Sequence, residues 1–201
     1  MPYHVTDITP FVYPTDPIGY IDSNWMFYSD ARWHYLSAPY DPIQEAYVPK
    51  DYHPRAKGVN KLHISAHIDD TPNAWNAIVG LLLSNRLRAK VGTRATLEKF
   101  VDPAPDSRHA RQRGKMITIY IDDQEAGPDT HEHWLDLFTA FEDALHAAHI
   151  RPMERPPENH AIGQRGYLSF RGAYDATDPH ASYQRANLAS PDAFAITTMC
   201  G

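Results

Sequence analysis

Cysteine is almost absent from this sequence, and its scarcity excludes two kinds of architecture. The only thiol is Cys200, beside the C-terminal residue. One cysteine cannot build a disulfide framework or a cysteine-based metal site. A chain without disulfides is typical of a reducing compartment, so we expect a cytoplasmic protein.

Long hydrophobic runs and N-terminal basic residues are also missing. The sequence has no apolar run long enough to cross a bilayer. No lysine or arginine precedes Arg32, and the first residues contain no apolar segment of the signal-peptide type. We therefore expect no membrane span and no secretory signal peptide.

Positive charge is in the minority. The chain has 19 Lys and Arg residues against 25 Asp and Glu residues, which gives a formal net charge of -6. Such a surface does not favour binding to nucleic acid or to an anionic membrane, and any cationic site must be local. The length of 201 residues, 42% of them hydrophobic, predicts one compact domain with a real core.

Composition changes near residue 58. Residues 1–57 are rich in aromatic side chains, and their many prolines exclude long helices. We predict that residues 1–57 form an N-terminal extension of short strands and turns packed on the core. Its aromatic side chains could line a groove for an extended peptide, although simple packing is their more ordinary role. Residues 58–201 are then the part that carries the site.

Strict alternation of apolar and polar residues predicts three strands, because a period of two is typical of a half-buried strand. They cover residues 59–68, 115–122 and 167–171. Their apolar faces consist of Leu62, Ile64, Ala66 and Ile68, then Ile117, Ile119 and Ile121, then Leu168 and Phe170. Their polar faces consist of Lys61, His63, Ser65 and His67, then Thr118 and Tyr120, then Tyr167, Ser169 and Arg171.

Helical spacing predicts three helices. The first is capped by Asp70 or Thr71, has Pro72 in its first turn and ends at Ser84–Asn85. The second covers residues 93–100, and the third covers residues 130–149. The buried stripes of the first and third helices are Trp75, Ile78, Val79 and Leu82, and Trp134, Leu137, Phe138, Phe141, Leu145 and Ala148. The expected fold is therefore α+β, a mainly antiparallel twisted sheet with helices packed on one face and a polar, cationic site on the other.

The polar faces of these strands carry groups that bind anions or transfer protons, namely Lys61 and His63, Tyr120, and Arg171. If the strands are neighbours in one sheet, these groups form one patch that would bind a phosphoryl group. Lys90 lies between apolar neighbours, which predicts a partly buried lysine. Cations around Lys90 would lower the pKa of its ammonium, so that the neutral amine could act as a base. The alternative is a surface lysine on a short connector.

A basic loop borders this patch in the sequence. Residues 102–114 include Arg108, His109, Arg111 and Arg113, which form either a solvated surface loop or a flexible clamp on an anion. The patch has no acidic cluster for a metal and no Gly-rich loop before a helix, so we expect neither a metal nor a nucleotide. Since no Ser or Cys nucleophile stands in a recognised setting, the pattern favours acid–base chemistry on a phosphorylated substrate.

Five segments resemble, in order and with similar spacing, those of one enzyme family. They are Gly58–Ser65, the helix with Pro72 and Gly80–Ser84, Ala89–Val91, Gly114–Tyr120 and Tyr167–Arg171. The same order is seen in the phosphothreonine lyases of bacterial type III effectors. It is also similar to the lyase domain at the N-terminus of class III and IV lanthipeptide synthetases. The resemblance covers roughly residues 58–171 and implies that residues 58–201 are a lyase-like catalytic domain.

The resemblance implies a β-elimination that uses neither a metal nor another cofactor. A phosphoserine or phosphothreonine in a peptide loses phosphate and leaves dehydroalanine or dehydrobutyrine. Lys90 takes the position of the family's base, which removes the α-proton, and His63 that of the acid, which protonates the leaving phosphate. Lys61 and Tyr120 match residues that stabilise negative charge on the substrate. Arg171 matches a phosphate-binding arginine.

Two phosphate-binding arginines of the family have no unique counterpart here. A direct alignment places Asp178 where the effectors carry a second arginine after the last strand, and Arg185 or a loop arginine could replace it. The arginine that precedes the strand of Tyr120 is equally open among Arg108, Arg111, Arg113 and Lys115. The predicted phosphate-binding set is therefore Arg171, Arg111, Arg113, Lys115 and Arg185.

The natural substrate is a separate question. The effectors act on mitogen-activated protein kinases through a basic and apolar docking motif near their N-terminus, which residues 1–31 lack. We therefore expect a stand-alone lyase of lanthipeptide-type biosynthesis, acting on a precursor peptide that a separate kinase phosphorylates, beside a cyclase. The first alternative is an effector-like phosphothreonine lyase with another docking mode.

Two further alternatives are weaker. A non-catalytic module would bind phosphopeptides or leader peptides, but binding alone does not need an acid–base pair such as His63 and Lys90. A phosphatase would need metal-binding carboxylates or a cysteine nucleophile, and the sequence shows neither in a recognised setting.

Overall fold

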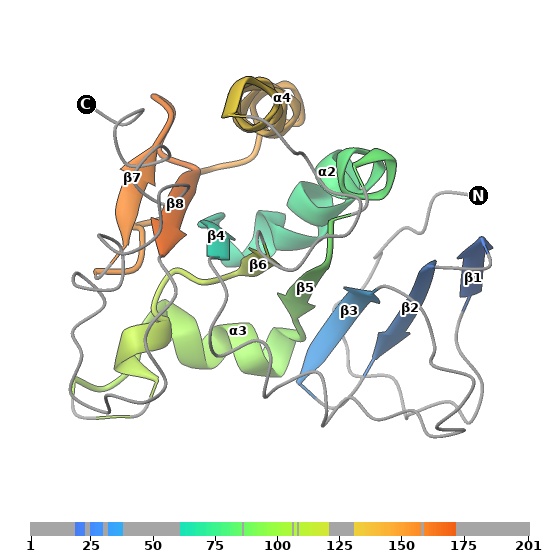
Figure 1. Cartoon of the computed structure of the whole chain (residues 1–201). Coiled ribbons are helices and arrows are strands. Elements are labelled where there is room, and N and C mark those ends of the chain that lie inside the picture. Colours follow the sequence, from blue (N-terminus) through green and yellow to red (C-terminus); the bar gives the residue numbers. More distant parts are fainter. Residues whose placement is uncertain are drawn as a thin grey trace, which may run out of the picture.

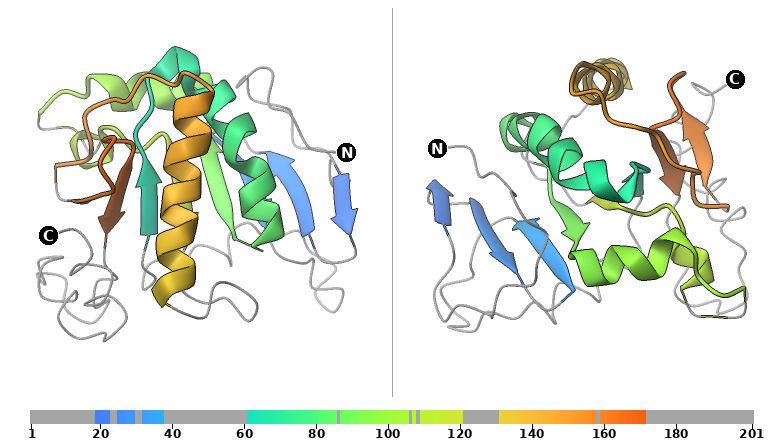
Figure 2. Two further views of the ribbon diagram at one scale, coloured as in Figure 1. Left: turned by 90° about the horizontal axis from the view of Figure 1, so that it is seen from above. Right: turned by 180° about the vertical axis from the view of Figure 1, so that it is seen from behind.

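An eight-stranded antiparallel sheet runs through the molecule (Figure 1). The computed structural model describes residues 19–22, 25–29, 32–37, 61–85, 87–105, 107, 109–120, 131–157 and 159–171. The strand order is β1-β2-β3-β5-β6-β4-β8-β7, and every pair of neighbours is antiparallel. Two long helices lie on one face of this sheet (Figure 2), which confirms the expected α+β class.

The strands are short and the helices lie close to their predicted positions. The strands are β1 (Gly19–Asp22), β2 (Trp25–Ser29), β3 (Trp33–Ser37), β4 (Lys61–Ile64), β5 (Ala89–Gly92), β6 (Ile117–Tyr120), β7 (His160–Ile162) and β8 (Leu168–Arg171). The helices are α2 (Thr71–Ser84), α3 (Arg94–Val101) and α4 (His131–Ala147), with 3-10 turns η1 (Ile68–Asp70) and η2 (Ala110–Gln112). None of the helices in the described part of the chain is long and apolar enough to cross a membrane.

The N-terminal strands belong to the same sheet as the rest. β3 pairs with β5, which places Tyr35 opposite Lys90 and Leu36 opposite Ala89. β2 and β1 continue the sheet outward from β3. The described residues of the aromatic N-terminal part therefore form short strands, and one of these strands lies directly beside the strand of Lys90.

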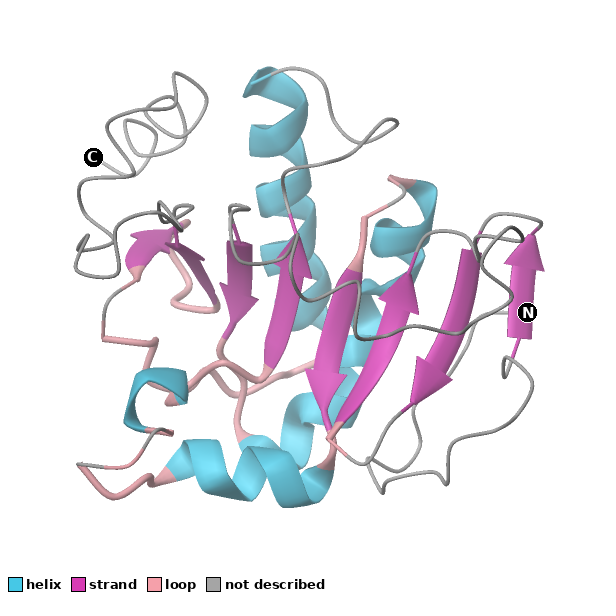
Figure 3. Ribbon diagram, turned by 60° about the horizontal axis from the view of Figure 1, so that its bottom comes forward, coloured by secondary structure: helices cyan, strands magenta, loops and turns pink. Residues whose placement is uncertain are grey.

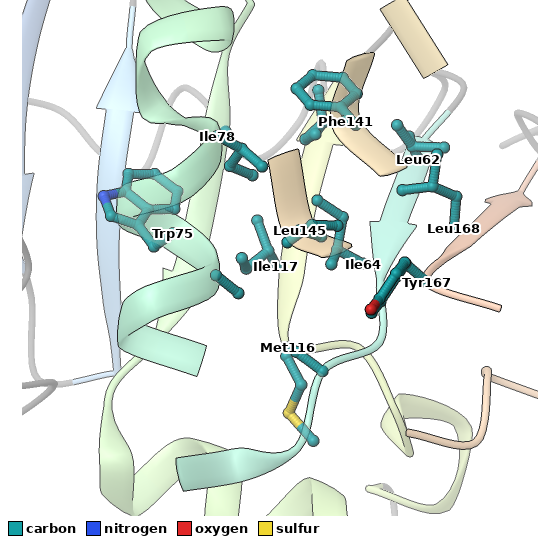
Figure 4. Close-up of a cluster of buried hydrophobic side chains, with 14 of the residues drawn as sticks. Leu62, Ile64, Trp75, Ile78, Met116, Ile117, Phe141, Leu145, Tyr167 and Leu168 are labelled. Atoms are coloured by element: carbon teal, nitrogen blue, oxygen red, sulfur yellow. The ribbon is translucent and has the colours of Figure 1, made fainter. Parts of the chain in front are cut away.

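The core fills the space between the sheet and the helices α2 and α4 (Figure 4). It contains the predicted apolar faces of β4 and β8, Ile117 and Ile119 of β6, and the predicted stripes of both helices apart from Ala148. Ile121 lies outside the described residues. Trp75 and Phe141 are among its largest fully buried side chains, and burial of a large apolar side chain contributes about 1.5–3 kcal/mol. Ala148 is an exception to the prediction, because α4 ends at Ala147 and Ala148 is exposed.

Tyr167 lies in the core and not on the polar face, where alternation placed it. Figure 4 shows its ring in the cluster of buried side chains. Its phenol OH donates a hydrogen bond to the carbonyl of Ile150 at 2.8 Å. Burial raises the pKa of this phenol above its usual value. The alternation of β8 begins only at Leu168, so the prediction for Tyr167 was wrong because the residue precedes the strand.

The first predicted strand is also shorter than its pattern. β4 ends at Ile64, although the Ser65 N–H still donates to the Tyr167 carbonyl at 2.9 Å.

The expected capping carboxylate of α2, Asp70, makes no cap bond and accepts hydrogen bonds from the Arg151 guanidinium at 2.7 and 2.9 Å. This ion pair ties the start of α2 to the segment that follows α4.

One buried carboxylate of α4 anchors the β7–β8 hairpin. Glu142 accepts hydrogen bonds from the main-chain N–H groups of Gln164 and Arg165 at 3.0 and 3.1 Å. Gly163 has a φ of +71° and lies so close to the carboxylate that a Cβ there would clash with it. Because β8 carries Arg171 at its end, this anchor also helps to position that guanidinium.

We predict that Glu142→Ala lowers the free energy of unfolding by about 2 kcal/mol, because two main-chain N–H groups lose their acceptor. Urea denaturation measures this change. Asp136→Ala removes an exposed carboxylate of the same helix and should change the free energy of unfolding by less than about 0.5 kcal/mol. If both variants are as stable as the wild type, the carboxylate does not anchor the hairpin.

Candidate active site

The face of the sheet opposite α2 and α4 carries a row of polar side chains. Figure 3 shows the sheet with these two helices behind it. The register places Lys90 of β5 opposite Thr118 of β6. On β4, His63 is opposite Thr118 on one side and opposite Ser169 of β8 on the other. Four strands therefore each contribute one residue to this first row.

A second row beside the first consists of two cations and a phenol. β4 places Lys61 directly between Tyr120 of β6 and Arg171 of β8. The Lys61 Nζ atom lies 5.9 Å from the centroid of the Tyr120 ring. An ammonium, a guanidinium and a phenol side by side can bind the oxygens of a phosphate. The register thus brings these three predicted residues together.

Lys90 and His63 face a common space across one strand. Neighbouring strands lie about 4.8 Å apart, so Cα atoms two strands apart are separated by about 10 Å. The residue between them is Thr118, whose side chain is short. A substrate group over Thr118 would have the lysine amine on one side and the imidazole on the other.

His63 is buried, with 2% of its surface exposed, and its environment disfavours a positive charge. Burial is the main cause that lowers the pKa of His63 well below its ordinary value. The positive charges of Lys115, Arg171, Lys61 and Lys90 lower it further, in that order. The imidazole is therefore neutral near pH 7.

A buried asparagine fixes the orientation of this ring. Asn159 Nδ2 lies 2.7 Å from His63 Nδ1 and donates a second hydrogen bond to Ser169 Oγ at 3.0 Å. With Nδ1 accepting, the neutral imidazole carries its proton on Nε2. Sequence reasoning missed Asn159, because the residue follows a proline-rich segment and belongs to no periodic pattern.

Arg88 is a second residue that the sequence interpretation missed. Its carbonyl accepts a hydrogen bond from the Tyr120 N–H at 2.9 Å, which continues the β5–β6 register by one residue. Arg88 therefore lies beside Tyr120 at the end of the second row. The sequence could have predicted this position, because Arg88 precedes Lys90 by two residues and residues two apart on a strand share a face.

The basic residues before β6 divide between the site and the surface. Lys115 is buried, and among the charged groups its ammonium lowers the pKa of His63 most. Arg113 instead forms an exposed ion pair with Glu154 at 2.8 Å, and Arg111 is exposed on η2. Of the predicted phosphate-binding residues in this segment, Lys115 is thus the one that the structure brings to His63.

A glycine turn precedes this lysine. Gly114 has a φ of +75°, and a Cβ there would clash with the carbonyl of Glu154. The turn directs the chain into Lys115 and then into β6. Arg108, Asp178 and Arg185 lie outside the described residues, so the expectations about them stay predictions.

The site gathers cations, an imidazole and a phenol. Within the described ranges, no three His, Cys, Asp or Glu side chains are grouped as the ligands of a metal ion would be. The acidic residues at the start of α2 are engaged by arginines, Asp69 by Arg94 and Asp70 by Arg151, each at 2.7 Å. The groups on the sheet face suit the binding of a phosphate ester and the transfer of a proton.

A family model described as OspF/SpvC matches residues 46–198 of the chain. The match includes every predicted site residue and begins after β3. No curated protein sequence matches the chain.

Solved structures of similar fold include three bacterial proteins. SpvC, a phosphothreonine lyase and effector from Salmonella, is 16% identical with a TM-score of 0.57, covering 94% of this chain and 89% of that one. VirA, a phosphothreonine lyase effector from Chromobacterium violaceum, is 17% identical with a TM-score of 0.57 and coverage of 96% and 87%. OspF, a type III effector and phosphothreonine lyase from Shigella flexneri, is 16% identical with a TM-score of 0.52 and coverage of 83% and 79%. At these identities the likeness shows a shared fold.

We predict that protonation of His63 destabilises the fold in acid. The pKa of His63 is lower in the folded chain than in the unfolded chain, where it is about 6.5. The unfolded chain therefore binds the extra proton between these two pKa values. The contribution to stability is complete above about pH 6.5 and falls by up to about 1.4 kcal/mol per pH unit below it, until the folded pKa is reached.

Urea denaturation at several pH values measures this slope. His63→Asn should reduce the slope by the contribution of one proton, because the variant cannot bind it. His146→Asn removes an exposed imidazole on α4 and should leave the slope unchanged. The same slope in His63→Asn and in the wild type would contradict a buried, neutral His63.

Proposed function

Because the chain belongs to the OspF/SpvC family, and SpvC and OspF are phosphothreonine lyases, we propose that it eliminates phosphate from a phosphorylated threonine or serine in a peptide or protein. Phosphothreonine lyases are carbon–oxygen lyases that act on phosphate esters. The residue left in the substrate chain is dehydrobutyrine from phosphothreonine and dehydroalanine from phosphoserine.

One observation carries this proposal, the placement of Lys90 and His63 on either side of Thr118, beside the row of Lys61 and Arg171. The row supplies positive charge for the phosphate. The pair supplies a base and an acid on the two sides of the substrate carbons. A site that only bound phosphopeptides would need the row but not the pair.

The proposed reaction transfers one proton to Lys90 and one from His63. The neutral Lys90 amine removes the α-proton, whose electron pair forms the Cα=Cβ double bond. The Cβ–O bond breaks, and its electrons go to the phosphate. His63, which is protonated once the phosphate is bound, gives its Nε2 proton to the leaving oxygen and returns to the neutral imidazole, so the products are an alkene and hydrogen phosphate, and no water is consumed. Lys61 and Tyr120 stabilise the negative charge that develops on the substrate.

Substrate binding changes the charge balance around His63. In the free protein, burial and four cations lower the pKa of its imidazole. A phosphate dianion placed against Lys61 and Arg171 offsets their charge and raises that pKa. The imidazole, neutral in the free protein, therefore takes up a proton when the substrate binds, and this proton is the one it passes to the leaving phosphate.

We propose that the substrate is a phosphothreonine-containing protein, because the solved structures that share the fold are effector lyases. This reverses the preference for lanthipeptide biosynthesis, which no comparison supports. A precursor peptide phosphorylated by a separate kinase is the second candidate, since residues 1–31 contain no basic docking motif. A kcat/KM at least about tenfold higher for a phosphorylated mitogen-activated protein kinase than for a phosphorylated lanthipeptide precursor would support the first, and the reverse ratio the second.

Mass spectrometry of a phosphothreonine peptide incubated with the protein in EDTA tests the reaction. We expect loss of the whole phosphoric acid, leaving an alkene that a thiol traps. Recovery of the free threonine would show hydrolysis and exclude the lyase function. Tight binding of an unchanged peptide would instead identify a binding module.

The base is tested with Lys90→Ala. We expect elimination to slow by about 10³-fold, because the variant lacks the group that removes the α-proton, while peptide affinity changes less than about threefold. Lys99→Ala removes an exposed lysine of α3 and should keep the wild-type rate. A wild-type rate in Lys90→Ala would show that another group is the base.

A further inference from the structure

Trp33 contacts the proposed base from outside the region that matches the family model. The Lys90 Nζ atom lies 4.1 Å from the centroid of the Trp33 ring. On β3, Tyr35 is opposite Lys90 and Trp33 is opposite Gly92, so the indole is the diagonal neighbour of Lys90 on the site face. Trp33 precedes residues 46–198, and the reaction proposed above does not use it.

Other rings hold the indole in this position. The Phe100 ring of α3 lies 5.8 Å from the Trp33 ring with an interplanar angle of 45°. The His109 ring lies 5.9 Å from the Phe100 ring at 42°. Trp33 is half-buried and Phe100 is buried. The indole therefore presents a defined face to Lys90, and the basic loop that contains His109 is linked to that face through Phe100.

An indole face attracts an ammonium ion more strongly than a neutral amine, because the ring quadrupole is negative over its face. Lys90 is neutral before it removes the α-proton and positive afterwards. The attraction to Trp33 therefore grows while the proton is transferred. An interaction that is stronger in the transition state than in the ground state lowers the activation barrier.

The other charged groups on this face of the described sheet oppose that positive charge. They are cations, namely Arg88 on the strand of Lys90, Lys61 on β4, Lys115 before β6 and Arg171 on β8. The uncharged titratable groups on the same face include Tyr35 on β3, His63 on β4 and Tyr120 on β6, and the register places Tyr28 of β2 opposite Tyr35. Trp33 thus supplies an attraction for the ammonium where its charged neighbours repel it.

We propose that Trp33 is a positioning residue of the elimination, whose indole holds the Lys90 amine at the edge of the site and stabilises the ammonium formed when Lys90 takes the α-proton. The proposal rests on the lyase function proposed above. It makes β3 a part of the active site in addition to an extension of the sheet.

Steady-state kinetics over a range of pH with a phosphothreonine peptide test this role. Trp33→Leu keeps an apolar side chain but removes the ring face. We expect kcat to fall about tenfold and KM to change less than about twofold. The rise of kcat with pH, which reports the deprotonation of Lys90, should move to lower pH by about half a unit or more, because the ammonium loses the attraction of the ring. Trp33→Phe keeps a weaker ring face and should give intermediate values. Trp134→Phe, which alters a tryptophan of α4 on the other side of the sheet, should keep the wild-type pH limb.

Competitive acetylation of Lys90, read by mass spectrometry, measures its ionisation without turnover. In Trp33→Leu, or in Trp33→Phe if the first variant does not fold, Lys90 should titrate at lower pH than in the wild type, while Lys99 is unchanged. Identical Lys90 titration and an identical pH limb would overturn the proposal. If the wild type does not eliminate phosphate, the lyase function fails, and the acetylation result alone decides whether Trp33 acts on Lys90.

Discussion

The antiparallel register of β4 is the constraint on which the site depends. β4 pairs with β6 on one side and with β8 on the other, and both pairings set the partners of Lys61 and His63. A shift of one residue would turn His63 toward the helices and Leu62 toward the site face. The burial of Leu62 and Ile64 against α2 and α4 opposes such a shift. The hydrophobic core therefore specifies the alignment of the chemical groups.

The site concentrates positive charge in a protein whose formal net charge is -6. Cations close to one another repel, and burial of a charge is costly unless a partner compensates it. His63 lowers this cost by staying neutral. A phosphate dianion would bring two negative charges to Lys61, Lys115 and Arg171 together, so binding of the phosphate is favoured at this place. Functional sites commonly depart in this way from what stability alone would select.

The sequence by itself determined which side of each element is buried. The period of two in β4 and β6 and the helical spacing in α2 and α4 follow from burying apolar side chains on one face, and this requirement acts locally. The same patterns gave wrong results where the elements end. Tyr167 precedes β8 and turns into the core, and Ala148 follows α4 and is exposed, because a periodic pattern does not mark its own last residue.

Only the tertiary structure decided which polar groups meet. Asn159 reaches His63 across 96 positions of sequence, and Trp33 reaches Lys90 because β3 pairs with β5. Strand order and register depend on how the whole core packs, and no local pattern encodes them. The periodicity of the sequence thus determined which side chains face the site, whereas the pairing of distant strands decided their partners.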